Sequence, residues 1–460
     1  MHVFSREKIV WYLIEIIVFL SCIIAIIIYY ITFTTTTTTT TVLESCCPPV
    51  SRRQNSIPVH YVTGTHYEVG YSVGRTFGSM IKEYLRLYEP LQSEFLPMYA
   101  QPEGRQIYEE SLKSTQKYFP QYVIELQGVA DGAKVPFHEL FLMALDDTLP
   151  KNLNASSKDK GPVGCTSLII NQPNAQLLGH TEDAMSETVN NYYIVAAHVV
   201  PDESELGGIF PAREEKFEAL AYAGHLPGYA SGHNHYGLVF SINTIFVSKP
   251  LKGKIPREFI TRAVLASRAD LGEILDVLTN EGVGTADGFN MNFAFLDVPK
   301  ESRVFHTAEV TPKIDSDRSE VYLADFGMGS NSLHTNRLLH LKYPELNEAA
   351  YGSSVSRESR YKHMTANKTA VNLQDMLEVL GNRDDDPWPI FSDKAEARVS
   401  TINLGVFDFN KKTWTLWTND PIDTPPLLQL PLTFADLIGP TRSDVSTNKI
   451  EVIETFYPDK

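Results

Sequence analysis

Cysteine is scarce in this sequence of 460 residues, which contains four: Cys22 in an apolar run, the adjacent Cys46 and Cys47, and Cys165. Cys165 stands alone in the long remainder of the chain, so no disulfide framework can be drawn across that part. A lone buried cysteine is most often a small hydrophobic residue. Any chemical role for Cys165 therefore needs support from the residues around it.

Basic residues are also few relative to acidic ones. Lys and Arg total 40 against 56 Asp and Glu, and the formal net charge is −16 at pH 7. An acidic surface repels phosphate groups, which argues against nucleic acid as a partner. Hydrophobic residues make up 43% of the chain and charged residues 21%. This composition excludes a largely disordered protein.

One long hydrophobic run is present, at residues 9–33, and its only charged residue is Glu15. About 20 apolar residues cross a bilayer, whereas the apolar part of a secretory signal spans roughly 7–15 residues. We therefore predict an uncleaved transmembrane signal anchor at residues 9–33; a cleaved signal peptide and a buried helix are the alternatives. Arg6 and Lys8 precede the run, which favours a cytoplasmic segment at residues 1–8. The protein is then a single-pass membrane protein with its bulk extracellular or lumenal.

A stalk is predicted at residues 34–57, where an unbroken threonine run at 34–41 is followed by two adjacent prolines. Such a composition cannot form a hydrophobic core. Two acceptor sequons for glycosylation begin at Asn154 and Asn367. They are consistent with lumenal exposure of the folded part.

Hydrophobic periodicity predicts helices in the first part of the folded region and strands after it. Helical spacing covers residues 66–98, and shorter helices are predicted at 118–133 and 136–145. A further helical stretch lies at 257–281. The predicted strands lie at 165–170, 176–180, 191–200, 237–246, 290–296, 302–306, 321–324, 399–408 and 413–417. This order of elements predicts an α+β layered domain.

Cys165 opens a strand-like run, and a turn at residues 171–174 leads into the next strand. A hairpin of this kind brings Asp183 back beside the start of the first strand, where an acid can hold a positively charged amine. That arrangement is useful if the bond between Gly164 and Cys165 is cut. The α-amino group of Cys165, whose ordinary pKa is about 7.7–8.0, would then suit a general base for the thiol of the same residue. By spacing alone, these residues are equally consistent with an ordinary hairpin.

Further motifs follow in a fixed order over residues 66–417. They are His-Tyr-Glu-Val-Gly-Tyr at 66–71, Glu-Leu-Gln-Gly-Val-Ala-Asp-Gly-Ala at 125–133, Gly-Cys-Thr at 164–166, Leu-Pro-Gly at 226–228, Gly-Leu-Val-Phe-Ser-Ile-Asn at 237–243, His-Thr-Asn at 334–336 and Ala-Arg-Val-Ser-Thr-Ile at 397–402. Together they resemble the cysteine N-terminal-nucleophile (Ntn) hydrolases of the acyl-CoA:6-aminopenicillanate (isopenicillin N) acyltransferase family, whose animal members include a β-alanyl-dopamine hydrolase. The resemblance implies a four-layer αββα Ntn-hydrolase sandwich. It also implies a helical pro-segment at residues 58–164, self-cleavage between Gly164 and Cys165, and a catalytic chain at 165–460, with both fragments remaining associated.

The resemblance implies a role for each of several residues. Cys165 is the implied nucleophile, and Asp183 is the acid beside the new amino terminus. Asn336 is implied to serve the oxyanion hole, and Asn243 corresponds to a polar residue of the site. From the residues alone, Asn336 is equally suited to cap a helix that begins at Arg337, and Asn243 to end a strand.

The resemblance leaves three candidates for the arginine of the site. Arg398 stands where the acyltransferase branch has one, and Arg357 and Arg360 compete for the assignment. Tyr229 and His225 flank the Pro-Gly turn, and we expect them to line the substrate pocket.

The implied function is that of a self-processing cysteine amidohydrolase that cleaves the amide bond of a small N-acyl amine, of the β-alanyl-amine type, through an acyl-enzyme on Cys165. No metal or organic cofactor is implied, and the expected partners are the substrate and the membrane. The alternatives are an acyltransferase that uses acyl-CoA, a lipid-amide hydrolase like acid ceramidase, and a catalytically silent, membrane-tethered binding ectodomain. The bile-salt and ceramide branches carry an arginine three residues before the aspartate, where this chain has His180. His180, which we expect to be a packed strand residue, therefore weakens the lipid-amide alternative.

Overall fold

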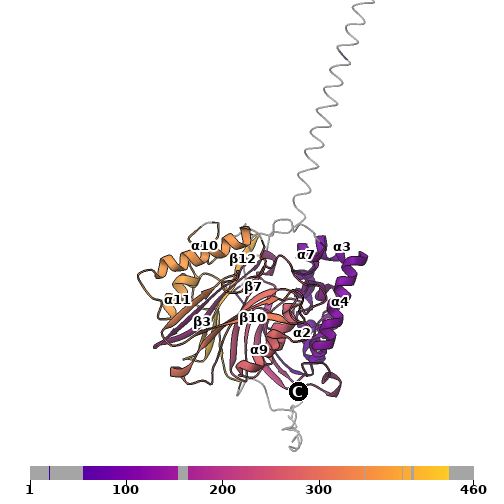
Figure 1. Ribbon diagram of the computed structural model, residues 1–460, viewed down its shortest axis with the longest axis horizontal. Helices are drawn as coiled ribbons and strands as arrows, with labels where there is room; N and C mark the ends of the chain where they lie inside the picture. The colour runs from indigo at the N-terminus through magenta and orange to yellow at the C-terminus, as the bar shows by residue number, and fades with distance from the viewer. Residues whose placement is uncertain are drawn as a thin grey trace, which may run out of the picture. The chain divides into compact units, whose positions relative to one another are not determined.

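Two β-sheets form the centre of the computed structural model, which describes Leu20 and residues 55–153, 164–346, 348–385, 387–394 and 398–434. The first sheet has the strand order β1-β4-β5-β6-β7-β8-β9-β10, and the second has the order β11-β2-β3-β12-β13-β14. Strand β1 pairs with β4 in parallel, and the other neighbouring strands of both sheets are antiparallel. The α+β class predicted from the sequence is confirmed (Figure 1).

The strands have the following bounds. Those of the first sheet are β1 (Val59–Gly64), β4 (Tyr192–Val199), β5 (Glu215–Tyr222), β6 (Ser231–Asn234), β7 (Leu238–Ile245), β8 (Gly288–Phe295), β9 (Phe305–Pro312) and β10 (Ser319–Phe326). Those of the second are β2 (Thr166–Gln172), β3 (Ala175–Met185), β11 (Ser330–His334), β12 (Val399–Asp408), β13 (Thr413–Trp417) and β14 (Leu428–Pro431).

Helices cover the outer face of each sheet (Figure 1). The first sheet is covered by α2 (His66–Leu87), the π-helix η1 (Leu91–Phe95), α3 (Leu96–Tyr99), α4 (Pro102–Tyr118), α5 (Pro120–Ala133), α6 (Phe137–Met143), α7 (Leu149–Asn152), α8 (Arg257–Leu265) and α9 (Leu271–Thr279). The second is covered by α10 (Glu348–Thr365) and α11 (Leu373–Leu380). Short 3₁₀ turns complete the structure at η2 (Ser186–Thr188), η3 (Glu203–Glu205) and η4 (Lys300–Ser302).

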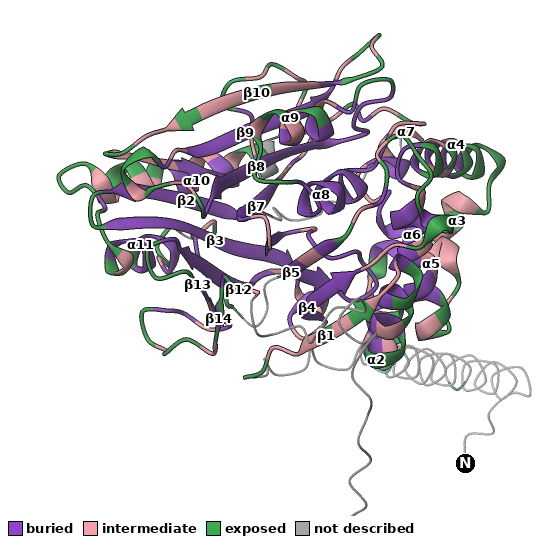
Figure 2. Ribbon diagram, turned by 90° about the horizontal axis from the view of Figure 1, so that it is seen from below, coloured by how far each residue is buried: buried purple, intermediate pink, exposed green. Residues whose placement is uncertain are grey.

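Three hydrophobic cores separate these layers, and the strands contribute to them in alternation. On β4, Tyr193 and Val195 pack under the helices of the first sheet, whereas Ile194 packs between the two sheets. On β2, Ile169 lies between the sheets and Leu168 lies under α11. Successive residues of a strand point to opposite faces, so strands covered on both sides are buried at nearly every position, as β2, β3 and β7 are in the middle of the molecule (Figure 2).

The two glycine-containing motifs of the pro-segment form a close contact between α2 and α5. A Cβ added at Gly70 would overlap the carbonyl group of Glu125, and one added at Gly128 would come within 2.8 Å of the backbone nitrogen of Tyr71. Only glycine permits this approach of the two backbones. These motifs therefore shape the helix pair that covers the first sheet.

Several elements differ from the sequence predictions. The region at residues 58–164 begins with a strand, β1, and contains α4, neither of which the periodicity indicates. The helix α4 is missed because a mostly polar, half-exposed helix carries little apolar periodicity. The strands β5, β6, β11 and β14 and the helices α10 and α11 are also absent from the predictions.

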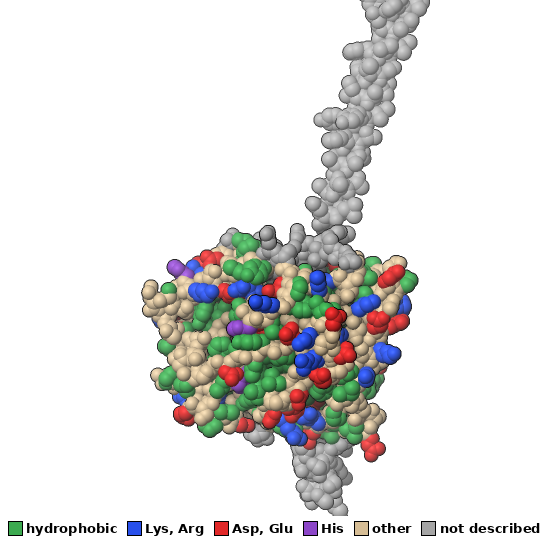
Figure 3. All heavy atoms as spheres, in the orientation of Figure 1, with side chains coloured by type: hydrophobic (Ala, Val, Ile, Leu, Met, Phe, Trp, Pro, Cys, Tyr) green, Lys and Arg blue, Asp and Glu red, His purple; other side chains and the backbone are tan. Residues whose placement is uncertain are grey.

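Other predictions fall on residues that the structure does not describe. The cytoplasmic segment at 1–8, the anchor at 9–33 apart from Leu20, and residues 34–54 of the stalk lie outside the described residues, as does Asn154. Among the described residues, no helix combines the length and the apolar character that crossing a membrane requires. Asn367 is exposed. On the face that Figure 3 shows, acidic and basic side chains are interspersed.

Candidate active site

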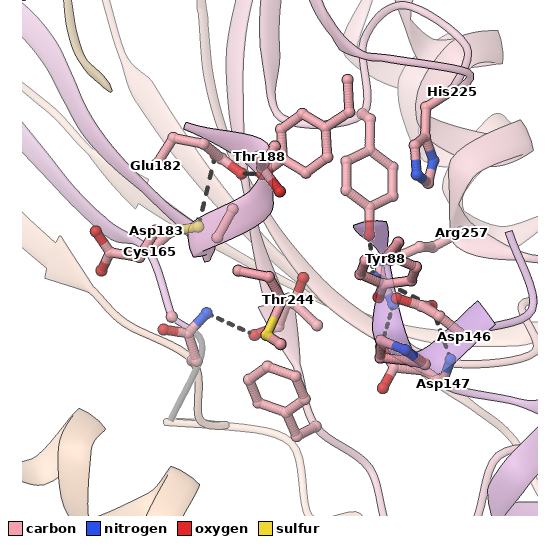
Figure 4. A pocket seen from close by; sticks show the side chains of 18 of the residues that line it. Tyr88, Asp146, Asp147, Cys165, Glu182, Asp183, Thr188, His225, Thr244 and Arg257 are labelled. Atoms are coloured by element: carbon pink, nitrogen blue, oxygen red, sulfur yellow. Dashed lines mark hydrogen bonds and ion pairs between the residues drawn. The ribbon is translucent and has the colours of Figure 1, made fainter. Parts of the chain in front are cut away.

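Cys165 lies immediately before β2, and the β2–β3 hairpin places the end of β3 beside it. Thr166 pairs with Thr181 across the hairpin, so the next residues of β3, Glu182 and Asp183, reach the level of Cys165. The Cys165 thiol donates to the Oε2 atom of Glu182 over 3.6 Å, and it is 6% exposed. The predicted return of Asp183 to the start of the first strand is confirmed (Figure 4).

Burial and nearby negative charge raise the pKa values of two groups at the hairpin, the Cys165 thiol and the Asp183 carboxyl. Burial, together with the carboxylates of Glu182 and Asp183, raises the pKa of the Cys165 thiol well above its ordinary value. Burial also raises the pKa of Asp183 to about 7, against the opposing effects of the Arg357 guanidinium and of a hydrogen bond from the Thr401 hydroxyl. In the uncut chain, the thiol is therefore protonated at neutral pH and needs a base before it can attack.

Glu182 is held by two partners besides the thiol. The Nε2 atom of His180 lies 2.7 Å from Oε2 of Glu182, and the Tyr222 hydroxyl donates to Oε1. The other ring nitrogen of His180 lies 2.8 Å from the Ser167 hydroxyl. His180 is thus buried within β3, as expected, and it also fixes a carboxylate that contacts the Cys165 thiol.

Arg357, on α10, is the arginine that contacts Cys165. Its guanidinium donates to the carbonyl oxygen of Cys165 over 2.7 Å, to the Thr166 hydroxyl over 2.9 Å and to Oδ1 of Asn336 over 2.8 Å. Arg357 is 2% exposed. Arg360, the other competitor, instead forms ion pairs with acidic side chains that follow α11.

Arg398, the first choice from the resemblance, lies elsewhere. Its side chain is 44% exposed, and Nη2 lies 3.8 Å from Glu89 Oε2. It borders a second cavity, of about 230 Å³, beside Gly164. Of the two candidates, Arg357 is the one that contacts Cys165, because α10 packs over the second sheet, whereas Arg398 directly precedes β12.

Asn336 lies next to the bond that the resemblance marks for cleavage. Its Nδ2 donates to the carbonyl oxygen of Thr244 over 2.9 Å. No helix begins at Arg337, so the capping alternative is wrong. A Cβ added at Gly164 would overlap Oδ1 of Asn336 and come within 2.6 Å of Nη2 of Arg357. A larger residue before Cys165 would therefore require the side chains of Asn336 and Arg357 to shift.

Asn243 belongs to a polar cluster between the sheets. Its Oδ1 accepts hydrogen bonds from the Ser167 hydroxyl over 2.9 Å and from Nδ2 of Asn292 over 2.8 Å. Its own Nδ2 is buried and has no hydrogen-bond partner among the described residues. A buried N–H without a partner is costly, and Asn243 directly precedes Thr244, whose carbonyl holds Asn336.

A cavity of about 100 Å³ opens beside the thiol. Figure 4 shows Cys165, Glu182 and Asp183 on one side of it and Asp146, Asp147 and Arg257 on the other. The remaining lining residues are Tyr84, Tyr88, Pro90, Gly164, Ala184, Met185, Thr188, Tyr222, His225, Tyr229, Thr244, Phe246 and Asn336. The expectation that Tyr229 and His225 line the pocket agrees with this geometry. The His225 Nδ1 lies 3.0 Å from Glu258, which orients its ring along the wall.

The acidic wall of the cavity was not anticipated from the sequence. Asp147 and Asp287 both pair with Arg257, whose Nη1 lies 2.9 Å from Asp287. The carboxylate of Asp146 lies 3.8 Å from the same guanidinium. Asp146 and Asp147 lie 19 and 18 residues before Cys165, but no motif or strand pairing in the sequence links them to it, so their position follows only from the fold.

Two groups of side chains in the described part of the chain have donor atoms close enough together to bind a metal ion. One is Cys165, His180 and Glu182; the other is Asp146, Asp147 and Asp287. In the second group Arg257 already supplies a positive charge to two of the acids. In the first, His180 and Glu182 are hydrogen-bonded to each other. In both groups, these direct pairings between side chains are favoured over a metal ion bound by all three.

Comparison with known proteins decides the family. The acyl-coenzyme A:6-aminopenicillanic acid acyl-transferase family matches this chain over residues 170–423. The chain belongs to this family. The matched residues include Asp183, Asn336 and Arg357 and begin shortly after Cys165. As a family member, the chain is an enzyme that acts on amide bonds as a hydrolase or acyltransferase.

A comparison with curated proteins finds a relative that is similar over most of both chains. The chain is 42% identical over 386 residues to a beta-alanyl-dopamine/carcinine hydrolase of Drosophila melanogaster, a match that covers 83% of this chain and 98% of that protein. Among solved structures, two of a conjugated bile acid hydrolase from Clostridium perfringens are 12% identical, with TM-scores of 0.36 and 0.38, and cover 60% of this chain and 94% of theirs.

Proposed function

We propose that this protein is a self-processing cysteine amidohydrolase that cleaves the amide bond of small N-acyl amines, with β-alanyl amides of aromatic amines as the substrate class. The observation that carries the proposal is the position of Cys165, at the head of β2, between Asp183 and the Arg357–Asn336 pair. The similarity to the Drosophila hydrolase supports the choice of substrate.

The first reaction is cleavage of the chain itself. The sulfur of Cys165 attacks the carbonyl carbon of Gly164, and the bond from that carbon to the Cys165 nitrogen breaks. The resulting thioester is opened by water, which leaves a carboxylate on Gly164 and a free thiol and α-amine on Cys165. The close packing of Asn336 and Arg357 against Gly164 holds the bond beside the nucleophile.

In the processed enzyme, the α-amine of Cys165 accepts the thiol proton and the thiolate attacks the substrate amide. Asn336 and Asn243 donate hydrogen bonds to the oxyanion, the latter with its unpartnered Nδ2. Asp183, whose carboxylate is buried beside Cys165, pairs with the α-ammonium group. Arg357 positions this set because it holds both the Cys165 carbonyl and the Asn336 side chain. Water then hydrolyses the acyl-enzyme.

The cavity suits a small substrate with an amine at one end and a ring at the other. Tyr84, Tyr88 and Tyr229 provide aromatic surface, against which a catechol or imidazole ring can stack. Asp146, on the opposite wall from Cys165 (Figure 4), offers a carboxylate to the ammonium group of a β-alanyl substrate.

The two fragments are proposed to stay together after cleavage. Strand β1 of the pro-segment pairs with β4 over its whole length, and the pro-segment shares one hydrophobic core with the first sheet. Buried Arg262 of α8 donates to both carboxylate oxygens of Glu125 in α5, over 3.0 and 2.8 Å. Because Asp146 and Tyr88 of the pro-segment also line the cavity, the substrate site is built from both fragments.

A direct experiment compares wild type and Cys165→Ala by intact mass and N-terminal sequencing. A fragment that begins Cys-Thr-Ser-Leu in the wild type alone supports self-processing, and cleavage of Cys165→Ala contradicts it. The processed protein is then assayed with β-alanyl-dopamine, carcinine, N-acetyldopamine and a long-chain N-acyl amine. Failure on the whole panel, with self-cleavage intact, favours the acyl-CoA-dependent transferase. A silent binding ectodomain neither cleaves itself nor is labelled by a thiol-reactive substrate analogue.

The membrane anchor is part of the same proposal, supported by the apolar run at residues 9–33. Extraction of membranes at alkaline pH, followed by detection of the full chain and of a chain that begins at residue 55, tests it. We expect only the full chain to remain in the membrane pellet.

A further inference from the structure

Self-cleavage raises a problem of proton transfer that the mature reaction does not have. In the uncut chain, the nitrogen of Cys165 belongs to the peptide bond with Gly164, so its lone pair is delocalised into the carbonyl group and it cannot act as a base. The buried thiol is protonated. A different group must therefore remove its proton in the first step.

Glu182 is placed to remove that proton. Its Oε2 accepts the hydrogen bond of the Cys165 thiol over 3.6 Å, and its side chain faces the cavity that Cys165 and Gly164 also line (Figure 4). Asp183 is the neighbouring acid, but it uses Oδ1 to accept from the Thr401 hydroxyl over 2.6 Å. Adjacent strand residues point to opposite faces, so the two acids approach Cys165 from different sides.

The position of Glu182 is fixed by its other contacts. His180 bonds to the same oxygen that faces the thiol, over 2.7 Å, and Tyr222 donates to the second oxygen. Glu182 is 4% exposed and His180 is 2% exposed. A carboxylate held in this way needs no rearrangement at the moment of reaction.

We propose, on the basis of the function proposed above, that Glu182 is the general base of self-cleavage and that His180 is its positioning residue. Glu182 takes the thiol proton as the sulfur bonds to the Gly164 carbonyl carbon. It returns that proton to the Cys165 nitrogen as the carbon–nitrogen bond breaks. The products are a Gly164 thioester on Cys165 and a free α-amine; water then releases the Gly164 carboxylic acid and restores the thiol. From that point the α-amine serves as the base for substrate turnover.

The test uses the full chain and follows the fraction cleaved over time by intact mass. We expect Glu182→Gln to slow self-cleavage at least 100-fold, since a general base contributes roughly 10²–10⁴-fold. The matched control is Glu218→Gln, which changes a buried glutamate paired with His233 over 3.3 Å and placed away from the cavity. Glu218→Gln should cleave at the wild-type rate. Thermal melts of all chains show whether each is folded.

A chemical rescue separates a base from a structural support. In Glu182→Ala, formate should accelerate self-cleavage in proportion to its concentration, because it can enter the space left beside the thiol. A purely structural role predicts no such dependence. The rate of self-cleavage in His180→Gln should fall less than in Glu182→Gln, since the base remains but is less well oriented.

A last comparison separates this proposal from the proposed function. A specific protease site placed within residues 154–164, so that cutting exposes Cys165, supplies the α-amine without self-cleavage. The protease-cut Glu182→Gln chain should then hydrolyse β-alanyl-dopamine at no less than a tenth of the rate of the wild-type chain cut in the same way. Wild-type self-cleavage in Glu182→Gln overturns the proposal, and so does an equal loss in both reactions. A wild-type chain that never cleaves overturns self-processing as a whole.

Discussion

The guanidinium group of Arg357 donates a hydrogen bond to the carbonyl oxygen of Cys165 over 2.7 Å. The two residues are 192 positions apart, and the contact joins α10 to the residue directly before β2. Because the same guanidinium also holds Asn336, it couples the position of Cys165, the proposed nucleophile, to that of Asn336, the proposed oxyanion donor. The consequences of this coupling can be measured.

Arg357→Ala should reduce amide hydrolysis by about 10²–10³-fold, the loss typical of removing an oxyanion donor, since Asn336 and Cys165 lose their shared support. The loss should appear in kcat more than in KM, because Arg357 is buried behind the nucleophile and does not line the substrate cavity. Arg398→Ala is the control and should alter kcat less than threefold. Equal effects of the two substitutions would contradict the assignment of Arg357.

Gly164→Ala should block or strongly slow self-cleavage and destabilise the uncut chain by about 1–3 kcal/mol, the range for overpacking a close contact. The physical reason is the overlap of the new Cβ with Asn336 and Arg357. Urea unfolding of both chains in a Cys165→Ala background measures the change in stability separately from cleavage. Gly327→Ala provides the comparison, because no heavy atom lies within 4 Å of the position of its Cβ, and it should leave both properties near wild type.

Part of this site follows from the sequence. The β2–β3 hairpin is predictable because two apolar runs flank a turn that contains Pro173 and Asn174, and pairing of Gln172 with Ala175 then fixes the register. That register alone places Asp183 beside Cys165. The space restriction at Gly164, by contrast, comes from Asn336 and Arg357, which lie far away in the sequence.

The rest depends on tertiary packing. Arg357 lies on α10, whose apolar residues show little helical periodicity, so neither the helix nor the direction of the side chain could be predicted. Arg398 lies in a motif that resembles the family, yet its side chain is 44% exposed and lies 3.8 Å from Glu89. Asp146 reaches the cavity because the helices at residues 66–152 pack on the first sheet. Glu182 lies next to the predicted acid Asp183 and could have been identified from the hairpin register.

Asp146→Asn should raise KM for β-alanyl-dopamine about tenfold, equivalent to about 1.4 kcal/mol, because the substrate ammonium group loses a carboxylate partner across the cavity from Cys165. The kcat should change little, since the residue is remote from the reacting bond. N-acetyldopamine lacks the amino group and serves as the internal control, with an expected change in KM of less than twofold. A similar rise in KM for both amides would show that Asp146 shapes the cavity without recognising the charge.

The pH dependence of stability provides a test of the burial of Asp183. Its pKa is raised from 3.8 to about 7 in the folded chain, so between pH 4 and pH 7 the folded state holds a proton that the unfolded state has released. Stability from this group is therefore present at the acidic end of that window and is lost as the pH rises toward 7. In an uncleavable Cys165→Ala background, Asp183→Asn should remove this dependence and stabilise the chain at pH 8 by a few kcal/mol relative to its effect at pH 4. Urea unfolding of the two chains at pH 4, 6 and 8 measures the difference. A difference that stays constant across the three pH values would mean that the Asp183 carboxyl is solvated in solution.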